Sequence, residues 1–185
     1  MSTAAPLLPD VLVSGLRIVF CGTAPGTASA RAGAYYAGPG NRFWQTLHEV
    51  GLTPVLLRPA EFARLPEFGI GLTDISKTAS GSDQEVGRRG FDRARLADAI
   101  AAASPAHLAF NGKNAARGAL GRPVGYGPQP ERLGGATVWV LPSTSGAARR
   151  FWDVGPWLQL ASARSRSPPC TSCPCHGKDN SCIVF

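Results

Sequence analysis

Four short apolar segments, each closed by a glycine or a polar turn, constrain the fold of this chain more than any other feature. Each has the length and the β-branched or aromatic content of a buried β-strand. The segments are LRIVFCG (16–22), GIGLTDIS (69–76), HLAFNG (107–112) and TVWVLP (137–142). Helical patterns lie between them, the clearest at Arg93–Ala103. Strands that alternate with helices favour a three-layer α/β/α domain with a short, mainly parallel central sheet.

The remaining segments complete a chain of one-domain size. Residues 23–40 are too rich in Gly, Pro and Ala for one regular element, and with residues 143–150 they are expected to form loops. A helix should begin at Asn41, which could cap it, and end at Gly51. Shorter helical patterns cover 61–69 and 114–120. The predicted organisation is an N-terminal extension (1–15), one domain (16–160) and a Cys-rich, disordered tail (161–185).

The polar turns that follow the four strands are the candidate ligand site. In parallel sheets, ligands bind at the carboxyl ends of the strands. This rule gathers GTAPG (22–26), TDIS (73–76), NGK (111–113) and PSTSG (142–146) on one rim.

The chain is basic, with a formal net charge of +7 and a pI of about 9.6. Residues 161–185 account for only +2 of this charge, so the predicted domain is itself basic. Such a balance favours a polyanionic partner, because contacts with phosphates release counterions. No apolar run is long enough to span a membrane, and no signal peptide is apparent. We expect an intracellular protein, in the cytoplasm of a prokaryote or the nucleus of a eukaryote.

The rim motifs, in order, resemble those of the mismatch-specific uracil-DNA glycosylase and thymine-DNA glycosylase family. They are VFCGTAPG (19–26), YYAGPGNRFWQTLHEVGLTP (35–54), IGLTDISKTASGSD (70–83), AFNGK (109–113) and LPSTSGAAR (141–149). The resemblance implies a monomeric, monofunctional enzyme that flips a damaged or mismatched base out of double-stranded DNA. It would hydrolyse the N-glycosidic bond of uracil, thymine or a deaminated purine, without a metal or cofactor.

The resemblance also assigns roles to rim residues. Tyr36 would stack on the flipped base, with Tyr35 as a weaker candidate. The expected base pocket contains Thr23, Ala24, Tyr36 and Asn111, and the expected DNA wedge and phosphate contacts are Ser143, Ser145, Gly146, Arg149 and Lys113. Ala147 and Ala148 stand where a bulkier wedge residue is common in the family. Arg149 would therefore fill more of the space that the flipped base leaves in the DNA stack. Lys113 and Arg150 could equally be solvated charges.

Ala24 departs from the family pattern, in which an asparagine at this place positions the attacking water. A carboxylate could replace it, and Asp83, in a polar loop, is preferred over Asp74, whose strand-end position favours a structural hydrogen bond. Alternatively, Asn41 supplies the amide, because related glycosylases with a YYxxPxNxFW segment act on deaminated purines such as hypoxanthine. The third alternative is a lesion-recognising DNA-binding module that cleaves poorly or not at all.

Four of the five cysteines lie in the tail, at positions 170, 173, 175 and 182. The CxxCxCH pattern contains metal-binding residue types but lacks the usual paired spacing, so no metal site is predicted. The last four residues also fit a prenylation box, and a reading-frame change would equally explain an unrelated tail. The remaining cysteine, Cys21, is expected to be a small buried hydrophobe.

Overall fold

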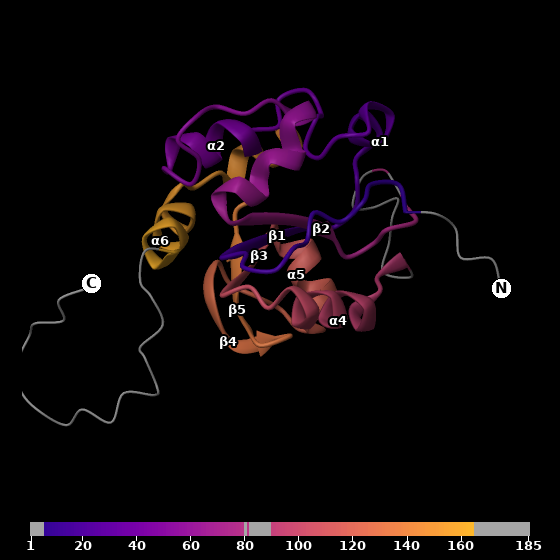
Figure 1. Cartoon of the computed structure of the whole chain (residues 1–185), viewed down its shortest axis with the longest axis vertical. Helices are drawn as coiled ribbons and strands as arrows, with labels where there is room; N and C mark the ends of the chain where they lie inside the picture. Colours follow the sequence, from indigo (N-terminus) through magenta and orange to yellow (C-terminus); the bar gives the residue numbers. More distant parts are fainter. Residues whose placement is uncertain (1–5, 80, 82–89, 165–185) are drawn as a thin grey trace, which may run out of the picture.

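A five-stranded sheet forms the centre of the protein, in a computed structural model that describes residues 6–79, 81 and 90–164 (Figure 1). The strand order is β2-β1-β3-β5-β4. The strands are β1 (Ile18–Gly22), β2 (Ile70–Asp74), β3 (His107–Asn111), β4 (Gly127–Leu133) and β5 (Ala136–Leu141). All neighbouring pairs are parallel except β4 and β5, which are antiparallel. The predicted fold class is confirmed.

Helices cover both faces of this sheet (Figure 1). The helical elements are α1 (Thr27–Ala32), α2 (Phe43–Glu49), η1 (Pro59–Phe68), α4 (Arg93–Ala103), α5 (Lys113–Leu120), η3 (Gly146–Phe151) and α6 (Gly155–Arg164). Phe20 of β1 packs with residues of α2, η1 and α6, whereas its neighbours Val19 and Cys21 pack with residues of α4 and α5. Successive side chains of a strand point to opposite faces, so the buried strands build two separate cores. Cys21 is buried, as predicted.

Four elements differ from the prediction. Helix α1 lies inside the expected loop 23–40, where Gly, Pro and Ala conceal its short helical run. Strand β4 was not predicted, because GPQPERL carries two prolines, and such a strand is tolerated at a sheet edge. The expected loop 143–150 contains most of η3, a 3-10 helix. Helix α6 runs across the expected domain boundary at 160 and continues to Arg164.

The residues before β1 pack against the sheet. Leu8 is buried in one core, and the backbone of Val11 exchanges two hydrogen bonds with Leu72 of β2, at 2.8 and 3.1 Å. This segment therefore covers the outer edge of β2. Within the described ranges, no helix is long and apolar enough to cross a membrane.

Gly71 is expected to be essential for this edge contact. A Cβ atom there would lie 2.6 Å from the main-chain oxygen of Val11 and 2.6 Å from Leu16 Cδ1. Gly71→Ala should therefore lower the free energy of unfolding by about 1–3 kcal/mol, as overpacking typically does. Chemical denaturation measures this effect, with Gly125→Ala as the matched control, because a Cβ at Gly125 meets nothing within 4 Å. Equal stability of the two variants would contradict this interpretation.

Candidate functional site

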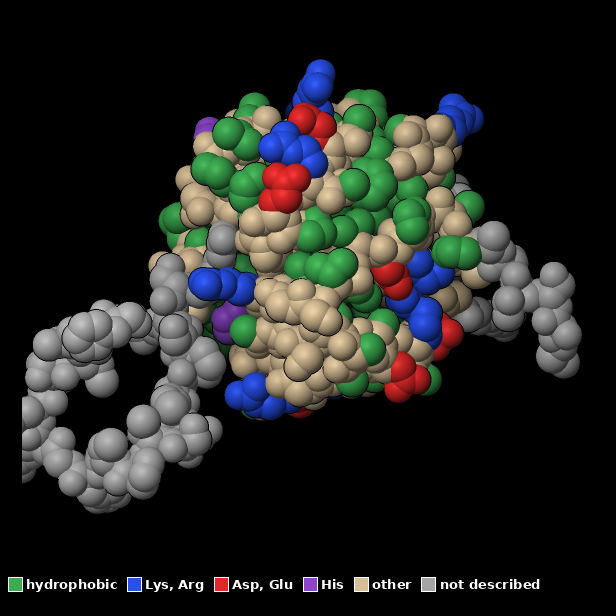
Figure 2. All heavy atoms as spheres, in the orientation of Figure 1, with side chains coloured by type: hydrophobic (Ala, Val, Ile, Leu, Met, Phe, Trp, Pro, Cys, Tyr) green, Lys and Arg blue, Asp and Glu red, His purple; other side chains and the backbone are tan. Residues whose placement is uncertain are grey.

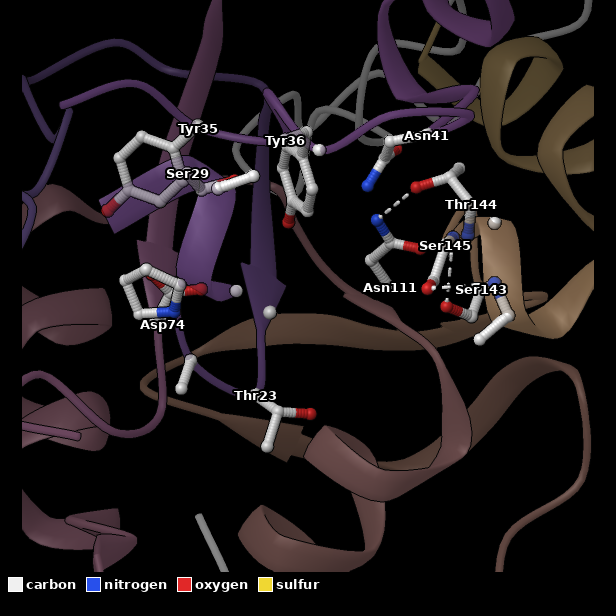
Figure 3. Close-up of a pocket in the computed structure, with 18 of the residues that line it drawn as sticks. Thr23, Ser29, Tyr35, Tyr36, Asn41, Asp74, Asn111, Ser143, Thr144 and Ser145 are labelled. Atoms are coloured by element: carbon white, nitrogen blue, oxygen red, sulfur yellow. Dashed lines mark hydrogen bonds between the residues drawn. The ribbon is translucent and has the colours of Figure 1, made fainter. Parts of the chain in front are cut away.

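A pocket of about 440 Å³ opens at the carboxyl ends of the parallel strands (Figure 3). Its volume lies in the range of small-ligand sites. The predicted site residues that line it are Thr23, Ala24, Tyr36, Asn41, Asp74, Asn111, Ser143, Ser145 and Gly146. Arg149 and Lys113 are not among its lining residues. Asp83 lies outside the described residues. Four segments that are far apart in sequence therefore meet at one site.

Tyr36 forms an aromatic wall of the pocket. Its ring stacks on Phe43 of α2, with centroids 4.0 Å apart and planes inclined by 28°. Its backbone has a φ of 54°, an uncommon conformation for an aromatic residue that often marks a functional site. The next residue is held in place because the Ala37 N–H donates to the Ser29 hydroxyl at 3.0 Å. Tyr36 is thus a rigid platform, braced from behind by Phe43.

Tyr35 has a different environment from its neighbour. Its side chain is buried, its hydroxyl donates to the Pro9 carbonyl at 3.1 Å, and Lys77 Nζ donates to that hydroxyl at 3.2 Å. Although Tyr35 also borders the pocket, its polar atom is already used within the protein.

Asp74 places a carboxyl group in the pocket wall. The residue is 2% exposed, and its Oδ2 atom has no hydrogen-bond partner among the described residues. The expected structural hydrogen bond from this oxygen is therefore not found. Gly22 lies opposite Asp74 on β1, and a Cβ atom on Gly22 would come within 2.5 Å of Asp74 Oδ1. The glycine of the first motif consequently makes room for the carboxyl group.

Asn41 lines the pocket and also bonds to the start of α2, although the N-cap residue of this helix is Arg42 and not Asn41. Its Oδ1 atom accepts a hydrogen bond from the Phe43 N–H at 3.0 Å, which satisfies a free donor at the start of α2. The helix itself begins at Phe43, later than predicted. Because the oxygen is engaged in this bond, the amide nitrogen points into the pocket (Figure 3).

Asn111 is fixed by Thr144, a residue that the sequence analysis did not select. Asn111 Nδ2 donates to the Thr144 hydroxyl at 2.8 Å, and the Thr144 N–H donates to Asn111 Oδ1 at 3.0 Å. The Thr144 carbonyl also accepts from the Arg42 N–H at 2.9 Å. Thr144 thereby joins the end of β3 to the loop before α2. Its position between Ser143 and Ser145, both predicted site residues, could have indicated that Thr144 also belongs to the site.

Element η3 forms part of the pocket rim. Ser145 caps it, and Gly146 packs against the main chain of Pro39 and Gly40. The exposed Arg149 lies with its guanidinium beside Gly40, so this predicted wedge residue contacts the opposite rim. Lys113 instead lies over the ring of Tyr126, at 4.1 Å from its centroid.

Some basic side chains lie near the pocket rim, but the basic residues do not form one continuous patch. The Arg42 guanidinium lies 5.0 Å from the ring centroid of Trp152. Arg149 and Arg150 belong to η3, just before Trp152 in the chain, and both are exposed. On the face drawn in Figure 2, acidic side chains lie beside lysines or arginines, so that face carries no uniform positive patch.

The fold and the site define a class: a small α/β protein with an aromatic-walled, polar pocket at the carboxyl edge of its sheet. The family model of the uracil DNA glycosylase superfamily matches residues 9–160, and the chain belongs to this superfamily. A solution NMR structure of a protein assigned as a uracil DNA glycosylase from Methanosarcina acetivorans has a similar fold. The TM-score is 0.58 and the sequence identity 24%, over 86% of this chain and 97% of that chain.

Proposed function

We propose that this protein is a monofunctional DNA glycosylase that flips uracil, including mismatched uracil, out of double-stranded DNA and hydrolyses its N-glycosidic bond. The observation that carries the proposal is the pocket, which offers one aromatic wall and several amide, hydroxyl and carboxyl groups. A flipped base needs this combination, because it must exchange base stacking and pairing for equivalent contacts in the protein. The superfamily membership supports the same class of reaction.

Recognition of the duplex is assigned to the rim. Arg42, Arg149 and Arg150 supply positive charge beside the mouth of the pocket, where phosphates of a bound duplex would approach. The contact between Arg149 and the loop at Gly40 places this side chain across the rim rather than inside the pocket. The proposed wedge is therefore a surface that supports the opened duplex next to the flipped nucleotide.

Water positioning is assigned to Asn41. Ala24 has no polar side-chain atom, whereas the Asn41 amide reaches the same pocket from the loop before α2. Cleavage of a glycosidic bond passes through a state with positive charge on the sugar, so a weak nucleophile suffices once it is correctly placed. An amide can hold the water oxygen without acting as a strong base.

The test is incubation with duplexes that contain uracil, thymine mispaired with guanine, or hypoxanthine, followed by alkali cleavage of abasic sites. Cleavage of the uracil duplex is expected, with lower rates on a fully paired control without a damaged base. Specific binding to all three lesions without any cleavage would reject the enzyme and establish the alternative, a lesion-recognising DNA-binding module. The absence of a polar side chain at Ala24 is the observation that favours this second candidate.

Asp83 provides a separate comparison, because its assignment as the catalytic carboxylate stays a prediction. With water held by Asn41, Asp83→Ala is expected to retain the cleavage rate within about tenfold, since loss of a general acid or base typically costs 10²–10⁴-fold. Single-turnover cleavage of the uracil duplex measures the effect. A loss beyond 10²-fold, with DNA binding preserved, would transfer the catalytic role to Asp83.

A further inference from the structure

Among the described residues that line the pocket, Asp74 carries a carboxyl group that water positioning by Asn41 leaves unused. Asp74 borders the pocket, is almost fully buried, and has an Oδ2 atom without a hydrogen-bond partner in the described part of the chain. A buried polar atom without a partner costs folding free energy, so such atoms require an explanation. Because Asp74 lines the pocket, we expect a ligand bound against this residue to supply the missing partner.

The nearest cations do not form ion pairs with this carboxyl group. Lys77 Nζ lies 2.7 Å from Asp10 Oδ1, and Arg95 Nη1 lies 2.7 Å from Asp10 Oδ2. The other terminal nitrogen of Arg95 donates to the main-chain oxygen of Asp74, at 2.5 Å, and not to its side chain. Asp10 thus pairs with both cations, and Arg95 in turn holds the strand end through the main-chain oxygen of Asp74.

Three titratable neighbours of Asp74 in the described part of the chain are uncharged at neutral pH. They are Cys21, Tyr35 and Tyr36, and burial, with a smaller contribution from Asp74, raises the pKa of each above its ordinary value. Burial likewise raises the pKa of Asp74 to about 7; Lys77 and Arg95 oppose this shift, and the charge of Asp10 adds to it. The carboxyl group is therefore protonated in a large fraction of molecules near neutral pH.

We propose that Asp74, as a neutral carboxylic acid, is the specificity-determining residue that reads the base edge on which an N–H group lies next to a carbonyl. The acid hydroxyl donates to the carbonyl of the base, and the acid carbonyl accepts its N–H, which gives two hydrogen bonds. Uracil, thymine and hypoxanthine all present this edge. An ionised carboxylate lacks the donor and repels the carbonyl. This assignment rests on the proposed function, since it describes substrate recognition in the same pocket.

Equilibrium binding tests the proposal without requiring cleavage. One duplex carries 2′-fluoro-2′-deoxyuridine, whose fluorine suppresses cleavage, and a second carries a tetrahydrofuran abasic analogue at the same position. The ratio of the two dissociation constants isolates the contribution of the base from that of the phosphates. For the wild-type protein, the preference for the uracil duplex should fall by about tenfold or more between pH 6 and 8.5, as the neutral acid is lost.

Variants separate base reading from other roles. Asp74→Asn keeps a donor and an acceptor without a titrating proton, so its preference should persist and become independent of pH. Asp74→Leu should lose the preference at every pH, whereas Asp98→Asn, a change of an exposed acid on α4, should behave as wild type. An N3-methyluracil duplex, which lacks the N–H group, should lose the preference with the wild-type protein.

Two results would overturn the assignment. One is a wild-type preference that does not change with pH, and the other is a folded Asp74→Asn protein that has lost the preference at all pH values. If Asp74→Asn does not fold, the wild-type pH series and the N3-methyluracil duplex still test whether Asp74 reads the base edge. Failure of the enzyme proposal would appear separately, as intact uracil DNA in the cleavage assay.

Discussion

Asn41→Ala is expected to lower the single-turnover rate of uracil excision by about 10²–10³-fold, the loss typical when one pre-positioned hydrogen-bond donor is removed from an active site. The amide nitrogen of Asn41 points into the pocket, and its oxygen is fixed by the Phe43 N–H at 3.0 Å. Binding of the 2′-fluoro-2′-deoxyuridine duplex should change far less than the rate, because the stacking wall at Tyr36 is retained. Rapid-quench cleavage and equilibrium binding, measured at one pH, give the two values.

The hydrogen bond from the Phe43 N–H to Asn41 requires its own control. Loss of this bond alone costs about 1 kcal/mol of stability, which could disturb α2 and the pocket. Asn41→Ser retains an oxygen that can accept from the start of the helix but has no amide to hold water. It should therefore recover most of the lost stability and remain about as slow as the alanine variant. Recovery of the rate together with the stability would show that Asn41 acts only by holding the start of α2.

Asp74→Asn is expected to change how stability depends on pH. Burial raises the pKa of Asp74 from 3.8 to about 7, so the folded protein keeps a proton that the unfolded chain releases. Between about pH 4 and 7 this group therefore makes the wild type less stable as pH rises, and above about 7 its contribution is constant. The difference corresponds to roughly 4 kcal/mol.

The measurement is the free energy of unfolding of both proteins at pH 4.5, 6 and 8. The stability of Asp74→Asn relative to wild type should increase from the lowest to the highest pH, because asparagine has no ionised form that must be buried. Other titrating groups are common to both proteins and cancel in the difference. Parallel pH profiles would mean that the Asp74 carboxyl group has a nearly ordinary pKa.

The sequence predicted the parallel strands because each is a continuous apolar run closed by a turn. The same rule missed β4, which alternates polar residues and prolines at the sheet edge. Helix α1 was missed because it has only six residues, most of them small, and is followed by a glycine-rich loop. Local patterns thus determine the buried strands, whereas edge and rim elements depend on tertiary contacts.

The site could be predicted only as a set of segments. Placing the polar turns at strand ends correctly gathered Thr23, Asp74 and Asn111 in one pocket, whereas Tyr36 was assigned to it by the family resemblance. The hydrogen bond between Asn111 and Thr144 depends on how β3 and β5 align. The space for the Asp74 carboxyl group depends on Gly22, which lies opposite it on the neighbouring strand. These relations involve residues on different strands, so no pattern within a single segment reveals them.

The segment around Val11 has a consequence for behaviour in solution. A parallel sheet with an open edge presents unpaired N–H and carbonyl groups that can recruit a strand from another molecule. The hydrogen bonds between Val11 and Leu72 cover the β2 edge, and the prolines of β4 interrupt the opposite edge. Removal of residues 6–11 should therefore make the protein prone to self-association through β2.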